Sequence, residues 1–397
     1  MHLVLRALYI YQEDGEPKSM LATHVDDMLW AAKPGYEDRV QQLLDSYTIK
    51  TVESGTFRFC GREVIQLPDF SISVRCKDTT EKIEPVRYDP KGRKQLDLAR
   101  DHEIAQLRSV VGSLAWVARQ CRPQLSYGVN KLQSVCATAT LDDLRFANKL
   151  LQEAKESSGD GLFFKSGLFS WNKMEMLTIT DASFGNESNF RSQKGRMTFL
   201  TGPESFGKNG MGVHLIGYSS TIIGRVCRST MQAETYALSD GVEESMRLRA
   251  ALADAHGVFL RTDWEHHAAR FMRNLWLVDC NSLSDHLRNP TFTKCSDKRL
   301  SIDLAALRQM IWLTPDGELR EDIGPEQPDM VRWIDTSCMV ADCNTKRMRS
   351  DRLSECIRSC WLDLNPTDES ILCKMKKQKG RAALDGNVDG HDMNDHE

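Results

Sequence analysis

The chain has 397 residues, 41% of them hydrophobic and 27% charged, which is enough for about two to four domains with buried cores. The formal net charge of −4 excludes a uniformly basic nucleic-acid binder, so any such binding has to come from local patches. No apolar run reaches the length of a membrane span, and the first residues lack the basic start and apolar core of a signal peptide. We therefore expect a soluble protein of the cytoplasm or nucleus with no membrane partner.

The beginning of the chain alternates apolar and polar side chains, which predicts strands over residues 3–11 and through residues 20–25. The Asp14-Gly15 pair between them favours a turn. Two adjacent carboxylates, Asp26 and Asp27, follow the second strand and precede an apolar run. Such a pair either forms a solvated turn or, exposed at a hairpin tip, binds a divalent metal for phosphoryl chemistry. The residues alone leave both interpretations open.

The rest of the first hundred residues combines a helix, a hairpin and a basic connector. One apolar helical face predicts a helix over residues 35–47, and strong alternation predicts a hairpin over residues 57–66 and 70–76. Residues 82–100 are the most basic part of the first half, and they either contact phosphates or form a solvated linker. The candidate nucleic-acid ligands in this connector are Lys91, Arg93 and Lys94.

Two helical stretches come next. Residues 103–120 and 125–157 carry helical apolar periodicity, and the Arg122-Pro123 step divides them. The composition then shifts near residues 157–161, where Ser and Gly gather, and this marks a domain boundary.

The second half has the element order β-β-β-α-β-α-α-β-α, which is typical of an α/β layer. The expected strands are residues 175–180, 195–201, 212–219, 275–279 and 330–335. A helix is expected from Ser229 to about Leu252, because Ser229 and Gln232 have the spacing of a capping box. The remaining helices are expected to begin near Ser282, Asp297 and Met339.

Four carboxylates of this half lie at strand ends or helix starts. They are Asp181, Glu234, Asp279 and Asp342. Each alone also fits a cap or a surface acid, but in an α/β layer such positions converge on one edge of the sheet. Oxygen ligands select Mg²⁺ or Mn²⁺, and two such ions can activate a water and stabilise the leaving oxygen in phosphodiester hydrolysis. The joint pattern therefore predicts a divalent-metal site.

Several ordered motifs over roughly residues 1–347 resemble those of copia-type retrotransposon Pol polyproteins. In the first half they are His24-Val25-Asp26-Asp27, which resembles the Tyr-Val-Asp-Asp polymerase loop, and the segments Phe59–Val64, Leu107–Leu114 and Arg122–Tyr127. In the second half they are the segments Thr180–Ser183, Ser229–Tyr236, Asp279–Asn281 and Val340–Lys346. The chain is thus similar to the end of a reverse transcriptase followed by ribonuclease H.

This resemblance implies a fold that mixes α/β and α+β parts. Residues 1–100 would be a truncated polymerase palm, and residues 101–158 a helical thumb or connection. Residues 170–347 would form a ribonuclease H-like α/β domain with a mixed five-stranded sheet and helices. The tail, residues 348–397, is loosely patterned, and we expect it to be mostly disordered.

The resemblance also implies a function, which is hydrolysis of the RNA strand of RNA–DNA hybrids. All four second-half carboxylates match catalytic, metal-binding positions of the family, and Mg²⁺ or Mn²⁺ would be the cofactor. Asp26 and Asp27 would be a vestigial polymerase metal site, because the upstream palm aspartate lies outside this chain and His24 replaces the family's tyrosine. The partners implied are the hybrid and an upstream part of Pol. A catalytically inactive nucleic-acid-binding remnant is the alternative, and a working polymerase is the least supported.

Overall fold

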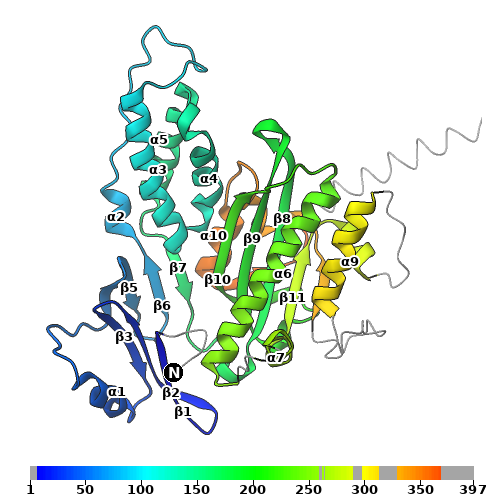
Figure 1. Cartoon of the computed structure of the whole chain (residues 1–397). Coiled ribbons are helices and arrows are strands. Elements are labelled where there is room, and N and C mark those ends of the chain that lie inside the picture. Colours follow the sequence, from blue (N-terminus) through cyan, green and yellow to red (C-terminus); the bar gives the residue numbers. More distant parts are fainter. Residues whose placement is uncertain (1–6, 259–261, 263, 289–296, 313–328, 368–397) are drawn as a thin grey trace, which may run out of the picture.

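The computed structural model of the chain describes residues 7–258, 262, 264–288, 297–312 and 329–367. The described strands form a three-stranded, a four-stranded and a six-stranded sheet, and helices cover them in a mixed α/β arrangement (Figure 1). Among the helices of these residues, none combines the length and the hydropathy that crossing a bilayer would require.

The three-stranded sheet is an antiparallel meander at the beginning of the chain. It consists of β1 (Leu8–Glu13), β2 (Glu16–His24) and β3 (Asp27–Ala32), and helix α1 (Glu37–Leu44) packs against it. The expected Asp14-Gly15 turn joins β1 to β2. The small buried cluster under this sheet is formed by Leu21, Val40 and Leu44.

The four-stranded sheet joins segments from both sides of the helical stretch. Its strands in order are β4 (Thr56–Phe59), β5 (Arg62–Gln66), β6 (Ile72–Arg75) and β7 (Gly161–Phe164). The expected hairpin is present, but its first strand is split in two, because Cys60 and Gly61 turn the chain. After the helices the chain returns through β7 to pair with β6, so the composition shift at residues 157–161 lies just before a strand of this sheet.

Three helices form a bundle beside this sheet. They are α3 (Asp101–Cys121), α4 (Ser126–Val135) and α5 (Leu141–Glu156), and short helix α2 (Lys77–Glu81) precedes them. The break after Cys121 confirms the division expected at Arg122-Pro123, but the second predicted helix is itself divided into α4 and α5. The apolar face of α3, including Leu107 and Leu114, is completely buried in the bundle core.

The six-stranded sheet carries the second half of the chain. Its strand order is β12-β11-β8-β9-β10-β13, in which β8, β9 and β10 are antiparallel neighbours while β11 is parallel to both β8 and β12. The strands are β8 (Glu175–Glu187), β9 (Arg191–Thr201), β10 (Gly210–Ile222), β11 (Asn274–Val278), β12 (Met330–Trp333) and β13 (Trp361–Asp363). The helices that follow these strands are α6 (Thr230–Ala255), α7 (Trp264–Phe271), α8 (Asn281–Arg288), α9 (Lys298–Trp312) and α10 (Asp351–Ser359).

The two faces of β8 meet different parts of the chain, as the alternation along a strand requires. Leu177 and Ile179 pack in one cluster with residues of α10 and of the short helix η7 (Val340–Asn344). Thr178 and Thr180 face α6, where a Cβ on Gly241 would lie only 2.6 Å from Cγ2 of Thr180. The missing side chain at Gly241 therefore lets α6 approach the sheet closely.

Three expectations about the second half of the chain and its tail are wrong for the described residues. The sheet has six strands rather than five, because β13 pairs with the edge of β10. Residues 351–363, expected to belong to a mostly disordered tail, form α10 and β13, since Leu353, Ile357 and Leu362 are buried against the sheet. The helix expected from Met339 is replaced by two short 3₁₀ segments before α10. Residues 368–397 lie outside the described residues.

Candidate active site

The register of the six-stranded sheet places two aspartates at one edge. Parallel pairing of β8 with β11 matches Ile179 with Leu277, so Asp181 and Asp279, two residues further on, emerge side by side where β11 ends. The sequence analysis expected a strand to end just before each aspartate. This is confirmed for β11, which ends at Val278, and wrong for β8, which continues past Asp181 to Glu187 because it stays paired with β9. Beyond the end of β11, β8 continues without that strand beside it.

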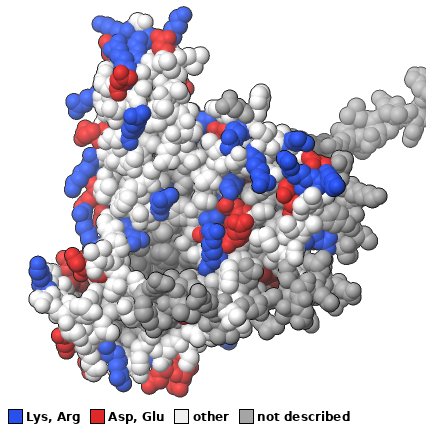
Figure 2. All heavy atoms as spheres, in the orientation of Figure 1, with Lys and Arg blue, Asp and Glu red and all other residues white. Residues whose placement is uncertain are grey.

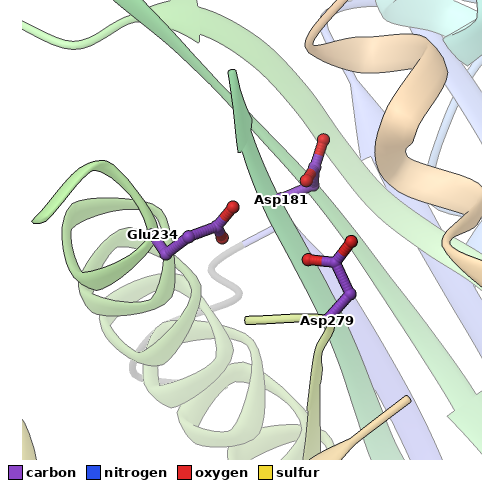
Figure 3. A group of neighbouring side chains, drawn as sticks. All are labelled: Asp181, Glu234 and Asp279. Carbon is purple, nitrogen blue, oxygen red and sulfur yellow. The ribbon is translucent and has the colours of Figure 1, made fainter. Parts of the chain in front are cut away.

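Helix α6 brings a third carboxylate close to these two aspartates. Glu234 lies seven residues before Gly241, two helical turns along the same face, so the close approach of the helix aims Glu234 at β8. One oxygen from each of Asp181, Glu234 and Asp279 lies within 4.8 Å of the others (Figure 3). The helix start is fixed by Ser229, whose Oγ accepts a hydrogen bond from the backbone N–H of Gln232, as the capping spacing predicted.

Burial and mutual repulsion oppose the ionised forms of these acids. Asp181 and Glu234 are each only 3% exposed. Burial, with the Asp342 carboxylate, raises the pKa of Asp181 to about 7. Burial, with the charges of Asp181 and Asp279, raises the pKa of Glu234 well above its usual range. Burial also raises the pKa of Asp279, against the hydrogen bond that Thr336 provides. A cation among the three would relieve this repulsion.

The donor set fits such a cation. Oε1 of Glu234 accepts a hydrogen bond from the Ala182 backbone N–H at 3.2 Å. Oε2 of Glu234 is buried and has no hydrogen-bond partner among the described residues. A buried carboxylate oxygen without a partner costs free energy unless a cation or donor satisfies it. Oxygen donors of this kind suit Mg²⁺ or Mn²⁺ rather than softer metals.

Asp342 lies next to the three acids but is not part of the closely spaced group. Its charge contributes to the raised pKa of both Asp181 and Asp279, which shows that it is near. Its Oδ1 lies 2.6 Å from Nζ of Lys346, one helical turn later in the chain. Of the four carboxylates that the sequence singled out, the structure therefore brings three into one group and pairs the fourth with a lysine.

Two further residues at the site were not assigned roles from the sequence, although both lie in the Val340–Lys346 motif. They are Thr345, whose hydroxyl donates a hydrogen bond to Oδ2 of Asp181, and Lys346. The i,i+4 spacing of Asp342 and Lys346 was a readable signal for their ion pair. The contact of Thr345 with Asp181 had no sequence signal, because the two residues are 164 positions apart.

The first-half carboxylates lie in a different sheet. Asp26 and Asp27 are exposed at the tip of the β2–β3 hairpin, next to Val25, which has a positive φ of 53°. Neither belongs to a group of three possible metal ligands within the part of the chain that the structure describes. The vestigial polymerase site therefore stays a prediction.

Basic side chains gather at the far end of the helical bundle, where the connector 82–100 lies (Figure 2). Lys91 and Lys94 are exposed there. Arg93, in contrast, is engaged within the fold, because its guanidinium donates hydrogen bonds of 2.7 and 3.0 Å to the buried carboxylate of Glu103. Nucleic-acid binding by this connector stays a prediction, and Lys91 and Lys94 are the residues free to provide it on the surface.

Comparisons with known proteins find a partial likeness to retrotransposon polyproteins. No family model matches it. The Ty1-DR5 and Ty1-LR2 Gag-Pol polyproteins of Saccharomyces cerevisiae are each 25% identical in an alignment of 182 residues that covers 41% of this chain and 10% of the relative. This chain thus matches about a tenth of the length of these curated relatives.

Solved structures with some likeness include a ribonuclease H1 and a viral reverse transcriptase. LC11-RNase H1, isolated from compost, is 13% identical, with a TM-score of 0.28 over 43% of this chain and 92% of that one. The foamy viral protease-reverse transcriptase in complex with RNA/DNA hybrid is 11% identical, with a TM-score of 0.45 over 83% of this chain and 37% of that one. The likeness to retrotransposon polyproteins is carried by the Ty1 relatives and the ordered motifs. Over the matched residues the chain is similar to part of a retrotransposon Gag-Pol polyprotein.

Proposed function

We propose that the second half of the chain hydrolyses the RNA strand of RNA–DNA hybrids, as a ribonuclease H-type endonuclease. The observation that carries this proposal is the group formed by Asp181, Glu234 and Asp279, whose oxygens lie within 4.8 Å of one another at a sheet edge. Three acids at such spacing, two of them buried and the third half-buried, are costly for a protein to keep unless they hold a cation. Hydrolysis of a phosphodiester is a reaction that a cation in this setting supports.

The metal would be Mg²⁺ or Mn²⁺, held by these three carboxylates, with Asp342 as the fourth ligand. When bound, it would supply activation of a water and stabilisation of the leaving oxygen. The protein itself holds the ligands in place. Ala182 orients the Glu234 carboxylate and Thr345 orients that of Asp181, so neither side chain has to reorganise when substrate arrives.

The hybrid would be held through its backbone and 2′-hydroxyl groups rather than through base edges. Such contacts carry little sequence information, so cleavage should show weak sequence preference. Exposed Lys91 and Lys94 are candidates for distant phosphate contacts, and we propose this role for them with the hybrid as partner.

The test is cleavage of a labelled RNA–DNA hybrid by the purified full chain. We expect product with Mg²⁺ or Mn²⁺, none with EDTA, and none from double-stranded DNA. Asp181→Asn and Glu234→Gln should lower the rate at least about a hundredfold, as loss of preorganised electrostatic groups does. Glu243→Gln is the matched control, because Glu243 is an exposed acid on the same helix. Absence of cleavage by the unaltered chain, or full activity in Asp181→Asn, would refute the proposal.

A hybrid-binding protein without turnover is the second candidate function. The observation that favours it is the 2.6 Å ion pair of Asp342 with Lys346, which neutralises one of the four acids. Hybrid binding that falls steeply with salt, with no product under either metal, would support this function.

For the hairpin that carries Asp26 and Asp27, the proposed partner is an upstream part of Pol. Primer extension that requires a separately supplied upstream chain would support that partnership.

A further inference from the structure

A hydrogen-bonded path runs from the helical bundle into the six-stranded sheet. The side-chain amide of Gln193, on β9, donates to Oδ1 of Asn130 at 3.0 Å and to Oγ of Ser220 at 2.8 Å. Asn130 belongs to helix α4, and Ser220 belongs to β10. Gln193 is 1% exposed, so both of its N–H groups are committed to these partners out of contact with water.

The path continues to the acids. Oγ of Ser220 donates to the backbone carbonyl of Asn344 at 2.6 Å, and Asn344 is the last residue of the short helix η7. The next residue, Thr345, donates to Oδ2 of Asp181. Asn344 and Thr345 are both completely buried. Four side chains therefore link α4 to the carboxylate at the centre of the site.

The short helix η7 needs such support from outside. It is a five-residue 3₁₀ segment, a type of helix whose own hydrogen bonds are poorly aligned. It also lies very close to the sheet, since a Cβ on Gly195 would be 2.9 Å from Cγ2 of Thr345 and 3.0 Å from Cβ of Asn344. The position of Asp342 and Thr345 is thus set by the surfaces that η7 touches, and α4 is one of them.

A second contact fixes α4 on the sheet. Glu187, near the end of β8, is buried and accepts a 2.9 Å hydrogen bond from the Tyr127 hydroxyl. The same carboxylate forms an ion pair with Lys131, one helical turn later on α4. Helix α4 is therefore held firmly enough for Asn130 to act as a fixed acceptor for Gln193.

We infer that Gln193 is a positioning residue through which helix α4 holds η7, and with it Thr345 and Asp342, against the metal-binding acids. The helical bundle is then part of the machinery of the site rather than a passive connector. This inference rests on the proposed function, in that the acids are taken to bind a divalent metal. It adds that residues of the bundle, far from the chemistry, determine metal affinity.

The test compares three variants of helix α4 in the full chain. Asn130→Ala removes the acceptor for Gln193, Asn130→Asp keeps an accepting oxygen at the same place, and Ser134→Ala is a matched control at an exposed position of the same helix. Mn²⁺ affinity is measured by electron paramagnetic resonance, which needs no turnover. We expect Asn130→Ala to weaken Mn²⁺ binding about tenfold, as loss of outer hydrogen bonds to a metal site does, while the other two bind like the unaltered chain.

Activity and stability separate positioning from a general structural role. In Asn130→Ala, kcat at fixed low Mg²⁺ should fall about tenfold, excess Mg²⁺ should restore it, and KM for the hybrid should not change. Gln193→Met, of similar size but without donors, should behave in the same way. Unchanged Mn²⁺ affinity in both variants, with or without a lower Tm, would overturn the inference. If the unaltered chain binds Mn²⁺ but cleaves nothing, the proposed function fails while the metal measurement still tests Gln193.

Discussion

The hydroxyl of Thr345 donates a hydrogen bond to the carboxylate of Asp181, across 164 positions of the chain. Both residues are buried, and they come from opposite ends of the α/β half. The contact joins the strand that begins the half to the short helix that follows its last parallel strand. A site built in this way is complete only when the whole half has folded, so metal binding at the site depends on contacts between segments far apart in the chain.

The first prediction concerns pH and the metal-free protein. Asp181 has a pKa of about 7 in the folded state and about 4 in the unfolded chain. Between about pH 4 and pH 7, the folded state therefore keeps a proton on this carboxyl group that the unfolded state has released. Its contribution to stability is therefore present at low pH and is lost as the pH rises toward 7. In EDTA, the free energy of unfolding by urea should be about 2 kcal/mol lower at about pH 8 than at about pH 5.5.

Asp181→Asn is the control for this pH dependence, since it removes the titrating group and should flatten most of the difference. Mg²⁺ should raise Tm more at about pH 8 than at about pH 5.5, because protons compete with the metal for the same oxygens. A metal-free protein that is more stable at the higher pH would contradict the prediction.

The second prediction is that replacing Glu234 raises the stability of the metal-free protein and abolishes metal binding. Glu234→Gln replaces a buried carboxyl group whose Oε2 has no hydrogen-bond partner among the described residues, and the new amide can donate to the neighbouring aspartates. In EDTA the variant should be more stable by about 1–3 kcal/mol, the usual cost of an unsatisfied buried group. Its Tm should no longer rise with Mg²⁺. The measurement is the Tm of the unaltered chain and of Glu234→Gln, each with and without Mg²⁺. An equal rise of Tm with Mg²⁺ in both proteins would contradict metal binding at Glu234.

The third prediction concerns the packing of η7 on β9. A methyl group at Gly195 would meet Thr345 and Asn344 at 2.9 and 3.0 Å, so Gly195→Ala should push η7 away from Asp181. We expect a stability loss of about 1–3 kcal/mol, as overpacking usually causes, and a larger loss of metal affinity than of hybrid binding. Gly217→Ala on the next strand is the control, because its nearest neighbour, Cδ1 of Leu248, would be at an ordinary 3.5 Å.

The fourth prediction separates the basic residues of the connector 82–100. Replacing Lys91 and Lys94 by alanine should leave Tm unchanged and reduce the salt dependence of hybrid binding by about one counterion per lysine. Arg93→Ala should instead lower Tm, because it leaves the buried carboxylate of Glu103 without its partner. Arg93 holds the pKa of Glu103 below its usual range, so this stabilisation is present near neutral pH and is lost in acid. A lower Tm in the variant that lacks Lys91 and Lys94 would contradict the prediction, because it would mean that these lysines stabilise the fold.

The sequence predicted the architecture of the second half because its information there is local. Period-two alternation located β8, β9 and β10, helical periodicity with the Ser229 cap located α6, and Asp279 stood where β11 ends. The sequence analysis did not predict the helix and the strand that form after residue 350. Helix α10 and strand β13 are short, and their stability comes from burial of residues such as Ile357 and Leu362 in a core formed by distant segments.

The sequence by itself determined which acids are at the sheet edge and in what order the elements come, since strand register and helix periodicity depend on neighbouring residues. Only the tertiary structure decided that Asp342 pairs with Lys346 while the other three acids lie within 4.8 Å of one another, and that Gln193 joins the helical bundle to the site. These outcomes depend on distances of a few ångströms between residues far apart in the chain. Electrostatic and hydrogen-bond energies change steeply over such distances, and no local pattern encodes them.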